Sequence, residues 1–585
     1  MKKIISLFLV LTLLLGSLSI LSGCAPKDAG AEIRVYLGDV IYDFDPTEYY
    51  ADDNAAQVMS LLYEPLFSLD DDGDLTLAAA KDYEIDEEKR TIRIELRESY
   101  WSNGARVTAE DFIYAWRDRI LDPSRSNPAA PLFYDIENAK AIKAGEAELY
   151  SFGAAKTGVY EITIRYVEGA DVDQLLKNLA SVAASPVSQS TVSAAPDTWS
   201  KMTGTCTTNG PFQLDVYDLE GEFTLARNIG YHQKTTVKDY DNKVRPNTLV
   251  SFWAGDEKVE LTYDAIENKT VFFMGDAALE ARKANAKKAE SAYALSTYSY
   301  VFNTENPLFA DAKVRYALSL AIDRAAIAEA VTFGDAATSV LSPLVENYKG
   351  KTFSEQIIST SAKESAAREL LAGVTLPANK AFTLTVADNE ESLAIANLVK
   401  ASWDALGFNV TVKAAKPITN TIKDAATDVE NKIVDDGIQV LLKNAANGKC
   451  DFDVIGIDWQ MYSYDPIVSL YAFTTKYNGN GVFFGDDGKN LATPRTMIGG
   501  WSSEAYDAKI AEAATKTGAE RDTLLREAEK LLVEEAPIVP VLYNESFGFI
   551  AKGLSRVDFD GFGMFVFTDA KQRNYRKYLP KADEN

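Results

Sequence analysis

Segments with the apolar periodicity of strands alternate with segments of helical periodicity through the second half of the chain, and this alternation restricts the fold more than any other feature. The expected strands are residues 382–387, 409–414, 453–457 and 538–543. The expected helices are residues 312–330, 361–371, 391–406, 422–446 and 503–535. Strands that alternate with helices favour an α/β domain built on a mixed sheet.

The first half of the chain adds three segments in which polar and apolar residues alternate, as in half-buried strands. These segments are residues 32–37, 91–96 and 160–166. A helix is expected at 108–120, because Thr108 is a favourable N-cap and Asp111 stands three residues later, close to a capping box.

The N-terminus has the order of regions that is typical of a secretory signal: Lys2 and Lys3, an apolar run over 4–20, and small residues before Cys24. A transmembrane helix is the alternative, because the run is nearly long enough to span a bilayer. The sequence up to Cys24 (LSGC) resembles the lipobox of bacterial lipoproteins. This resemblance implies a signal peptide over 1–23, a lipid on Cys24 and a linker over 24–30.

A lipid on Cys24 places the protein in the cell envelope, exported and anchored at the outer face of the cytoplasmic membrane or in the periplasmic space. About 560 residues then remain, which exceeds the size at which one hydrophobic core keeps growing, so we expect two or more domains.

Charge and composition exclude several classes of function. The net charge of −26 disfavours binding to nucleic acid or to anionic lipid surfaces. His232 is the single histidine, so zinc sites and catalysis by Ser-His or Cys-His pairs lack their usual residues. The chain also lacks Gly-x-Ser-x-Gly, His-Glu-x-x-His and phosphate-binding-loop motifs. We therefore expect a protein that is not an enzyme and that has no cofactor and no metal site.

Two cysteines remain besides Cys24. Cys206 and Cys450 are an even pair in an oxidising compartment, so a disulfide between them is possible, and two unpaired thiols are the alternative.

Five motifs along the chain resemble those of bacterial extracellular solute-binding protein family 5, the oligopeptide- and dipeptide-binding receptors of ABC importers. They are residues 63–66 (YEPL), 101–123 (WSNGARVTAEDFIYAWRDRILDP), 208–212 (TNGPF), 321–324 (AIDR) and 536–540 (APIVP). We expect most of these residues to have structural roles, since Asn209-Gly210 suits a turn and Asp323-Arg324 suits a helix end.

The resemblance implies the periplasmic-binding-protein-like type II fold, in which two large lobes joined by a hinge enclose the ligand and an extra domain is inserted. Domain I would be residues 31–66, 174–296 and 546–585, domain II 67–173 and domain III 297–545. The protein would capture an oligopeptide and deliver it to an ABC permease and its ATPase subunits, acting as a monomer on its lipid anchor. The alternatives are a receptor for a non-peptide solute, such as a sugar, an opine or a capped peptide, and a peptide-sensing lipoprotein.

The family binds its peptide as an added strand between the lobes. By position, the strand partners would be residues 49–53 and 456–466. The candidate ligand contacts are Tyr49, Tyr50, Asp52, Asp53, Asp458, Trp459, Gln460, Tyr462 and Asp465.

One candidate departs from the family pattern. Tyr462 stands where oligopeptide receptors carry an Asp that pairs with the peptide α-ammonium, so a charge-assisted hydrogen bond of roughly 1.5–3 kcal/mol is absent there. Asp458, Asp465, Asp52 and Asp53 are the possible substitutes. Our hypothesis is that an amine is still recognised, through Asp458 or through one of the domain I aspartates Asp52 and Asp53. The alternative is a ligand without a free α-amine.

A second departure is the stretch 416–450, which is longer than the family's usual connection. We interpret it as an added helix on the surface, and a specificity element is the alternative.

Overall fold

The computed structural model describes residues 31–48, 52–202, 204–219, 221–232, 244–252, 262–423, 430–481 and 497–574. The signal peptide, Cys24, Tyr49 and Tyr50 lie outside the described residues. None of the helices in the described part of the chain combines the length and the apolar character that a membrane span requires.

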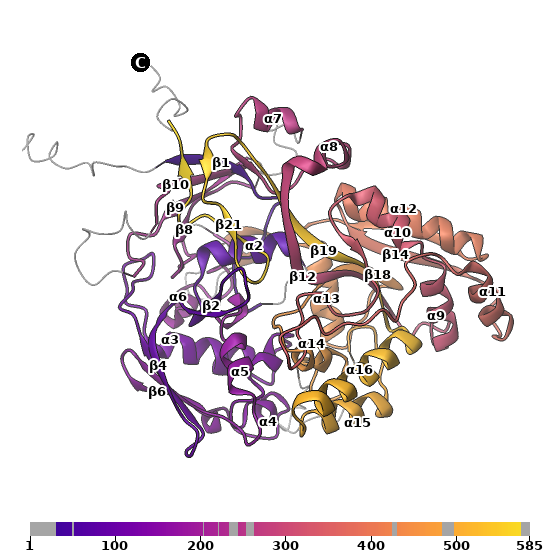
Figure 1. The fold of residues 1–585 in the computed structure, drawn as a ribbon, viewed down its shortest axis with the longest axis horizontal. Helices are drawn as coiled ribbons and strands as arrows, with labels where there is room; N and C mark the ends of the chain where they lie inside the picture. The colour runs from indigo at the N-terminus through magenta and orange to yellow at the C-terminus, as the bar shows by residue number, and fades with distance from the viewer. Residues whose placement is uncertain are drawn as a thin grey trace, which may run out of the picture.

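A mixed sheet of eleven strands forms the centre of the described chain (Figure 1). Its order is β15-β14-β18-β12-β19-β11-β1-β10-β9-β8, and β13 pairs with β19. The strands are β1 (Glu32–Tyr36), β8 (Phe212–Tyr217), β9 (Glu222–Arg227), β10 (Thr248–Phe252), β11 (Phe273–Met274), β12 (Ala289–Phe302), β13 (Asp335–Ala336), β14 (Ala381–Ala387), β15 (Asn409–Ala415), β18 (Val454–Gln460) and β19 (Ile538–Ile550).

The long antiparallel strands β12 and β19 run through the middle of this sheet and connect its two halves (Figure 1). We call the described residues before 289 and after 550 the first lobe, and those between 303 and 537 the second lobe. The register of β12 against β19 shifts between Tyr293 and Thr297, which is where the chain passes from one lobe to the other.

Helices cover the second lobe. They are α9 (Ala312–Leu320), α10 (Arg324–Val331), α11 (Glu364–Ala372), α12 (Glu390–Ala405), α13 (Gly437–Ala446), α14 (Pro466–Leu470), α15 (Glu504–Ala513) and α16 (Gly518–Glu535). The first four of these helices bury a cluster of apolar side chains around Trp403. The expected strands of the second half are confirmed, as are the helices expected at 361–371 and 391–406, each within a few residues.

Two expected helices are each divided in two. The helix expected at 312–330 breaks because Asp323 accepts a hydrogen bond from the amide of Ala326 and starts α10 afresh. The helix expected at 503–535 breaks before Gly518, whose φ of +61° belongs to the left-handed region that favours glycine.

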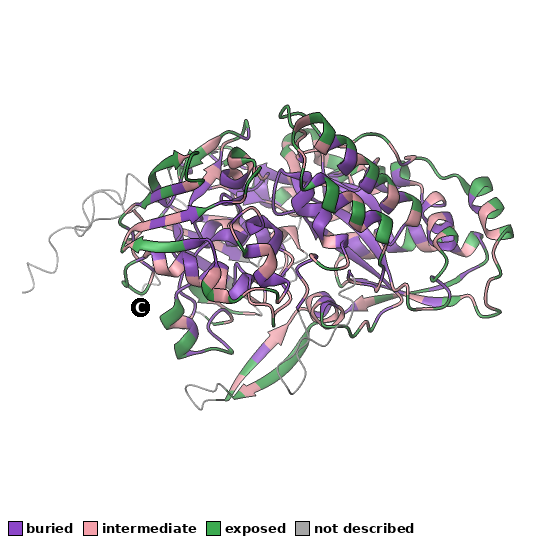
Figure 2. Cartoon of the chain, turned by 90° about the horizontal axis from the view of Figure 1, so that it is seen from below, coloured by how far each residue is buried: buried purple, intermediate pink, exposed green. Residues whose placement is uncertain are grey.

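The prediction of one helix over 422–446 is wrong. The chain forms a hairpin of β16 (Ile418–Lys423) and β17 (Glu430–Asp435), and α13 begins only after Asp436, which caps it. β-branched residues dominate the segment before Asp436, and they favour extended backbone over helix. The hairpin is largely exposed and extends away from the body of the molecule (Figure 2).

The first lobe adds a four-stranded sheet of order β4-β5-β7-β6 and a group of short helices. The strands are β4 (Ala80–Asp86), β5 (Thr91–Leu96), β6 (Ala154–Gly158) and β7 (Glu161–Arg165), next to a hairpin of β2 (Phe67–Leu69) and β3 (Leu75–Leu77). The helices are α2 (Asp53–Leu62), α3 (Ala109–Ile113), α4 (Ala139–Lys143), α5 (Val172–Asn178), α6 (Gln189–Ala194), α7 (Tyr263–Glu267) and α8 (Leu279–Asn285). The predicted capping box of Thr108 and Asp111 is confirmed, and α3 continues with π-helical hydrogen bonding over Tyr114–Ile120.

Motifs that are far apart in the sequence meet in the structure. Asn209 donates to the carbonyl of Glu64 at 2.8 Å and accepts from the amide of Glu64 at 3.1 Å. Arg324 is 1% exposed and donates to the carbonyl of Pro540 at 2.8 Å. These contacts give Asn209 and Arg324 the structural roles that we expected.

The possible disulfide is not formed. Cys206 is buried with its Sγ atom 3.9 Å from the hydroxyl of Tyr63, while Cys450 has its Sγ atom 3.9 Å from the carbonyl oxygen of Phe452. Both are free cysteines, as in the alternative interpretation.

Candidate ligand-binding site

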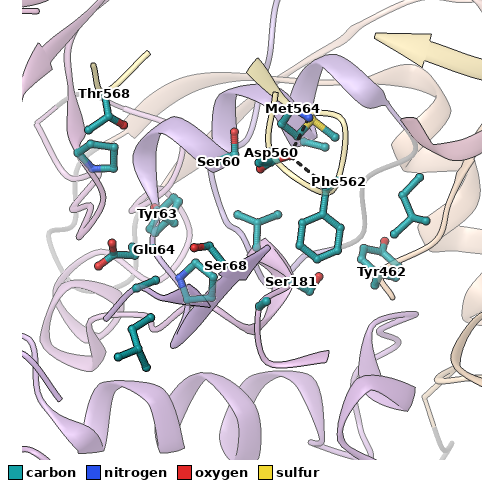
Figure 3. A pocket seen from close by; sticks show the side chains of 18 of the residues that line it. Ser60, Tyr63, Glu64, Ser68, Ser181, Tyr462, Asp560, Phe562, Met564 and Thr568 are labelled. Atoms are coloured by element: carbon teal, nitrogen blue, oxygen red, sulfur yellow. Dashed lines mark hydrogen bonds between the residues drawn. The ribbon is translucent and has the colours of Figure 1, made fainter. Parts of the chain in front are cut away.

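A cavity of about 250 Å³ lies where α2, the end of β18 and the C-terminal part of the chain meet (Figure 3). Helix α2 contributes Ala56 and Ser60, and the residues after β18 contribute Met461 and Tyr462. The lining also contains Glu64, His232, Asp560, Phe562 and Met564. Residues of both lobes therefore line the cavity, next to β12 and β19, the strands that connect the lobes.

Asp53 is the best-connected candidate residue. It is the first residue of α2, and Ala56 and Ser60 follow it on the same helix face. Its carboxylate accepts hydrogen bonds from Gln460 at 2.6 Å, Ser296 at 2.8 Å and Asn544 at 2.8 Å. These donors belong to β18, β12 and β19, so Asp53 binds the strands that join the lobes.

Asp458 lies on the other side of the same amide. Asn544 donates to Asp458 Oδ1 at 2.8 Å while it donates to Asp53, and its own side-chain oxygen accepts from the amide of Tyr298 at 3.1 Å. We call Asp53 and Asp458 the acid pair. Burial and the charge of Asp53 raise the pKa of Asp458 well above its usual range. Burial also raises the pKa of Asp53, against the hydrogen bonds that stabilise its charge.

More carboxylates surround the acid pair. Burial raises the pKa of Asp52 to about 7, with a contribution from the charge of Asp436. Burial and the charge of Asp276 raise the pKa of Asp39 to about 6. Arg282 offsets part of this charge by donating to Asp276 and to Glu391 at 2.5 Å each.

Because they belong to the expected strand partner 49–53, Asp52 and Asp53 were expected in an extended strand. The structure places them at the start of α2 instead. Asp52 is the N-cap of α2, and its side chain accepts from the amide of Asn54 at 2.8 Å. The carbonyl oxygen of Asp52 accepts from the amide of Ala56 within the helix, so both this carbonyl and one carboxylate oxygen of Asp52 are engaged at the start of α2.

Gln460 and Tyr462 line the cavity, whereas Trp459 packs edge-on against Phe473 with ring centroids 4.9 Å apart. Trp459 thus packs outside the residues that line the cavity.

Asp465, another predicted ligand contact, is not among the residues that line the cavity. Asp465 is 1% exposed, caps α14, and accepts from Arg521 with both carboxylate oxygens, at 2.8 and 2.7 Å. In this ion pair, Arg521 neutralises the negative charge of Asp465 that a ligand amine would need.

Sequence reasoning missed several residues of the site. Ser296 and Asn544, which donate to Asp53, were not among the candidates, because each is one of several polar residues in a long strand. His232 and Glu64 line the cavity, with His232 Nε2 2.7 Å from Glu64 Oε2. Asp560 accepts from the amides of Phe562 and Met564, and burial raises its pKa to about 7 (Figure 3).

A sequence model of bacterial extracellular solute-binding proteins, family 5 Middle, matches residues 74–481, which is more than half of the chain. The chain is a family 5 solute-binding protein. Members of this family are solute-binding proteins rather than enzymes, and they act outside the cytoplasm, in the periplasm or extracellularly.

Two curated relatives align with most of this family 5 protein. The "Probable deoxycholate-binding periplasmic protein YgiS" of Escherichia coli is 26% identical, with 84% of each chain covered. The dipeptide-binding protein DppE of Bacillus subtilis is 27% identical, with 84% of this chain and 82% of the relative covered.

A solved structure, Listeria monocytogenes OppA bound to peptide, superposes with a TM-score of 0.75 at 20% identity. The superposition covers 94% of this chain and 99% of that chain. The fold of the family 5 protein is therefore that of the type II periplasmic binding proteins, as expected. The three-segment domain division stays a prediction.

Proposed function

We propose that this protein is the substrate-binding lipoprotein of an ABC importer, and that it captures peptides with a free amino terminus. The observation that carries the proposal is the acid pair. Asp53 and Asp458 come from different lobes, share the amide of Asn544, and have no lysine or arginine partner among the described residues. A ligand ammonium group supplies the missing positive charge.

The raised pKa values of the acid pair support this assignment. Two carboxylates that repel each other in a buried site favour protonation, and a cation placed between them reverses that preference. A hydrogen bond from an ammonium group to a carboxylate stabilises the complex by roughly 1.5–3 kcal/mol. The acid pair thus supplies the negative charge that Tyr462 does not carry.

The lining of the cavity includes Gln460, which donates to Asp53, but neither member of the acid pair. This lining suits a ligand that is bound mainly through its backbone. Its walls combine apolar groups such as Phe562 and Met564 with the polar side chains of Ser60 and Gln460. Most ligand pockets have this composition, in which a few polar groups fix orientation. The side chains of a peptide then need only fit the remaining space, which permits many sequences.

The relative named for deoxycholate binding motivates a second candidate, a non-peptide solute. Deoxycholate is an anion at neutral pH. The acid pair has no lysine or arginine partner among the described residues, so it offers no positive charge to an anion and favours the peptide ammonium group over the bile acid.

Calorimetric titration tests the proposal. Trialanine is expected to bind at least tenfold more tightly than N-acetyl-trialanine, because the acetyl group removes the ammonium charge. Equal affinities would exclude amine capture. Binding of deoxycholate without binding of either peptide would establish the second candidate.

Delivery to a permease is the remaining part of the proposal. A lipid on Cys24 confines the receptor to the membrane surface, which raises its effective concentration near the permease. Cys24→Ser is expected to leave peptide binding in solution unchanged and to reduce peptide uptake by cells. Unchanged uptake by cells that carry the variant would contradict a role of the anchor in delivery.

A further inference from the structure

The segment between β15 and β18 lies across the boundary between the lobes. It contains the hairpin β16–β17 and helix α13, and both strands that flank it belong to the second lobe. We call residues 416–447, as far as they are described, the inserted arm. We propose that the inserted arm is a latch that holds the second lobe against the first lobe and so stabilises the closed arrangement around the ligand.

Helix α13 contacts the first lobe next to the acid pair. Lys443 Nζ lies 3.3 Å from Glu48 Oε2, four residues before the cap of α2. Glu48 also pairs with Arg125 and lies 3.7 Å from Arg119. Glu48 therefore pairs with two cations of the first lobe and with one cation, Lys443, of the inserted arm.

The opposite end of α13 is near the same part of the first lobe. Its N-cap, Asp436, is close enough to Asp52 for its charge to raise the pKa of Asp52. Lys443 thus brings its end of the helix to Glu48 of the first lobe, and the charge of Asp436 acts against Asp52 from the other end.

The hairpin makes a second ion pair across the boundary. Asp435, the last residue of β17, pairs with Lys201 of the first lobe, and Lys201 lies 3.7 Å from Asp43 as well. The side chain of Lys201 is 16% exposed and that of Asp435 is 23% exposed. Asn420 of β16 donates to the second carboxylate oxygen of Asp435 at 2.9 Å, which fixes its orientation.

Hydrogen bonds add to the ion pairs. Ser126 Oγ is 3.1 Å from the carbonyl oxygen of Ala446 and 3.1 Å from Asn447 Oδ1. Ile438 and Leu442 are 4% and 0% exposed, and they belong to the large apolar cluster that spans both lobes. The contacts of the inserted arm with the first lobe are therefore its ion pairs and the hydrogen bonds of Ser126.

A latch of this kind acts on the equilibrium between open and closed arrangements. Contacts that exist only when the lobes are together favour the closed arrangement, and a ligand that requires closure then binds more tightly. Each ion pair alone is worth little, but reversing one charge converts attraction into repulsion within a network.

Charge reversal in the unliganded protein tests the latch directly. Lys443→Glu places a second anion against Glu48, and Asp435→Lys places a second cation against Lys201. Lys449→Glu is the matched control, because Lys449 pairs 3.3 Å from Asp451 within its own lobe. Small-angle X-ray scattering reports the radius of gyration, which is expected to rise in both latch variants and to stay unchanged in the control. Scattering profiles that are the same in all four proteins would overturn the latch.

The consequence for ligand affinity rests on the proposed function, and the same variants separate the two. Trialanine is expected to bind about 5-fold to 30-fold more weakly to Lys443→Glu and to Asp435→Lys than to the control, as a loss of one or two kcal/mol of closure predicts. If trialanine binds none of the proteins while scattering shows opening, the peptide assignment fails and the latch stands. If affinity for trialanine is equal in all of them, the arm does not act on ligand closure.

Discussion

Asp53 and Asp458 come from different lobes and accept hydrogen bonds from the same side-chain amide, that of Asn544. Removing one charge of the acid pair tests its role in amine recognition. Asp458→Asn keeps the shape of the side chain and is expected to weaken binding of trialanine about tenfold or more, because one charge-assisted hydrogen bond is lost. Calorimetry with N-acetyl-trialanine is expected to show no such loss.

Asp451→Asn serves as the matched control for this experiment, since Asp451 pairs with Lys449 away from the cavity. A tenfold loss in the control, or an equal loss for free and acetylated peptides, would remove the acid pair from amine recognition.

The pKa of Asp52 predicts a pH dependence of stability. Between pH 4 and pH 7 folded Asp52 keeps a proton that the unfolded chain has released, so the free energy of unfolding falls as pH rises through this window. A shift from 3.8 to about 7 corresponds to at most about 4 kcal/mol above pH 7. Asp52→Asn removes the penalty, so urea unfolding is expected to show stabilisation at pH 8 and almost none at pH 4.

Asp52→Ala separates charge from capping, because Ala removes the hydrogen bond to Asn54 as well. Its stability is expected to lie about 1 kcal/mol below that of Asp52→Asn at both pH values. A stability gain of Asp52→Asn that is the same at pH 4 and pH 8 would contradict the assigned titration.

The ion pair of Arg521 and Asp465 predicts a structural role without a role in binding. Arg521→Ala leaves a carboxylate that is 1% exposed without its partner, which costs about 3 kcal/mol of unfolding free energy. Equilibrium unfolding in urea measures this loss. Arg368→Ala breaks an exposed pair with Glu364 and is expected to cost below about 1 kcal/mol.

Combining Arg521→Ala with Asp465→Asn is expected to restore part of the stability, since the unpaired charge is gone. If Arg521→Ala is as stable as Arg368→Ala, the pair does not stabilise the fold.

Thiol labelling can check that Cys206 and Cys450 are free. In the Cys24→Ser protein, alkylation under denaturing conditions without reductant is expected to label two thiols, and reductant is expected to leave the thermal midpoint unchanged. Labelling of no thiol until reductant is added would show a disulfide between Cys206 and Cys450.

Local periodicity predicted most of the strands and helices because their apolar spacing matches how they are buried. β14, β15 and α12 follow this rule closely. It failed at residues 418–435, where exposed β-branched residues carry no burial pattern that distinguishes a hairpin from a helix. It also failed at Asp323 and Gly518, where single residues end a helix inside a longer apolar pattern.

The site was predictable in part. The sequence indicated Asp53 and Asp458 as candidate charges and Gln460 and Tyr462 as neighbours of the ligand. It gave no indication that Asn544 joins Asp53 to Asp458, because that contact depends on a register shift between β12 and β19. The role of Asp465 was misjudged because its partner, Arg521, stands 56 residues later in the chain.

Asn544 and Ser296 lie on β19 and β12, the paired strands that join the lobes, and this position has a mechanical consequence. A rotation about these strands, which act as a pivot, produces a small displacement near them and a large one at the far end of each lobe. A ligand that displaces the hydrogen bonds of Asp53 acts at that pivot, so a shift of one side chain can swing surfaces that never touch the ligand. A permease that detects those distant surfaces would register occupancy without contacting the cavity.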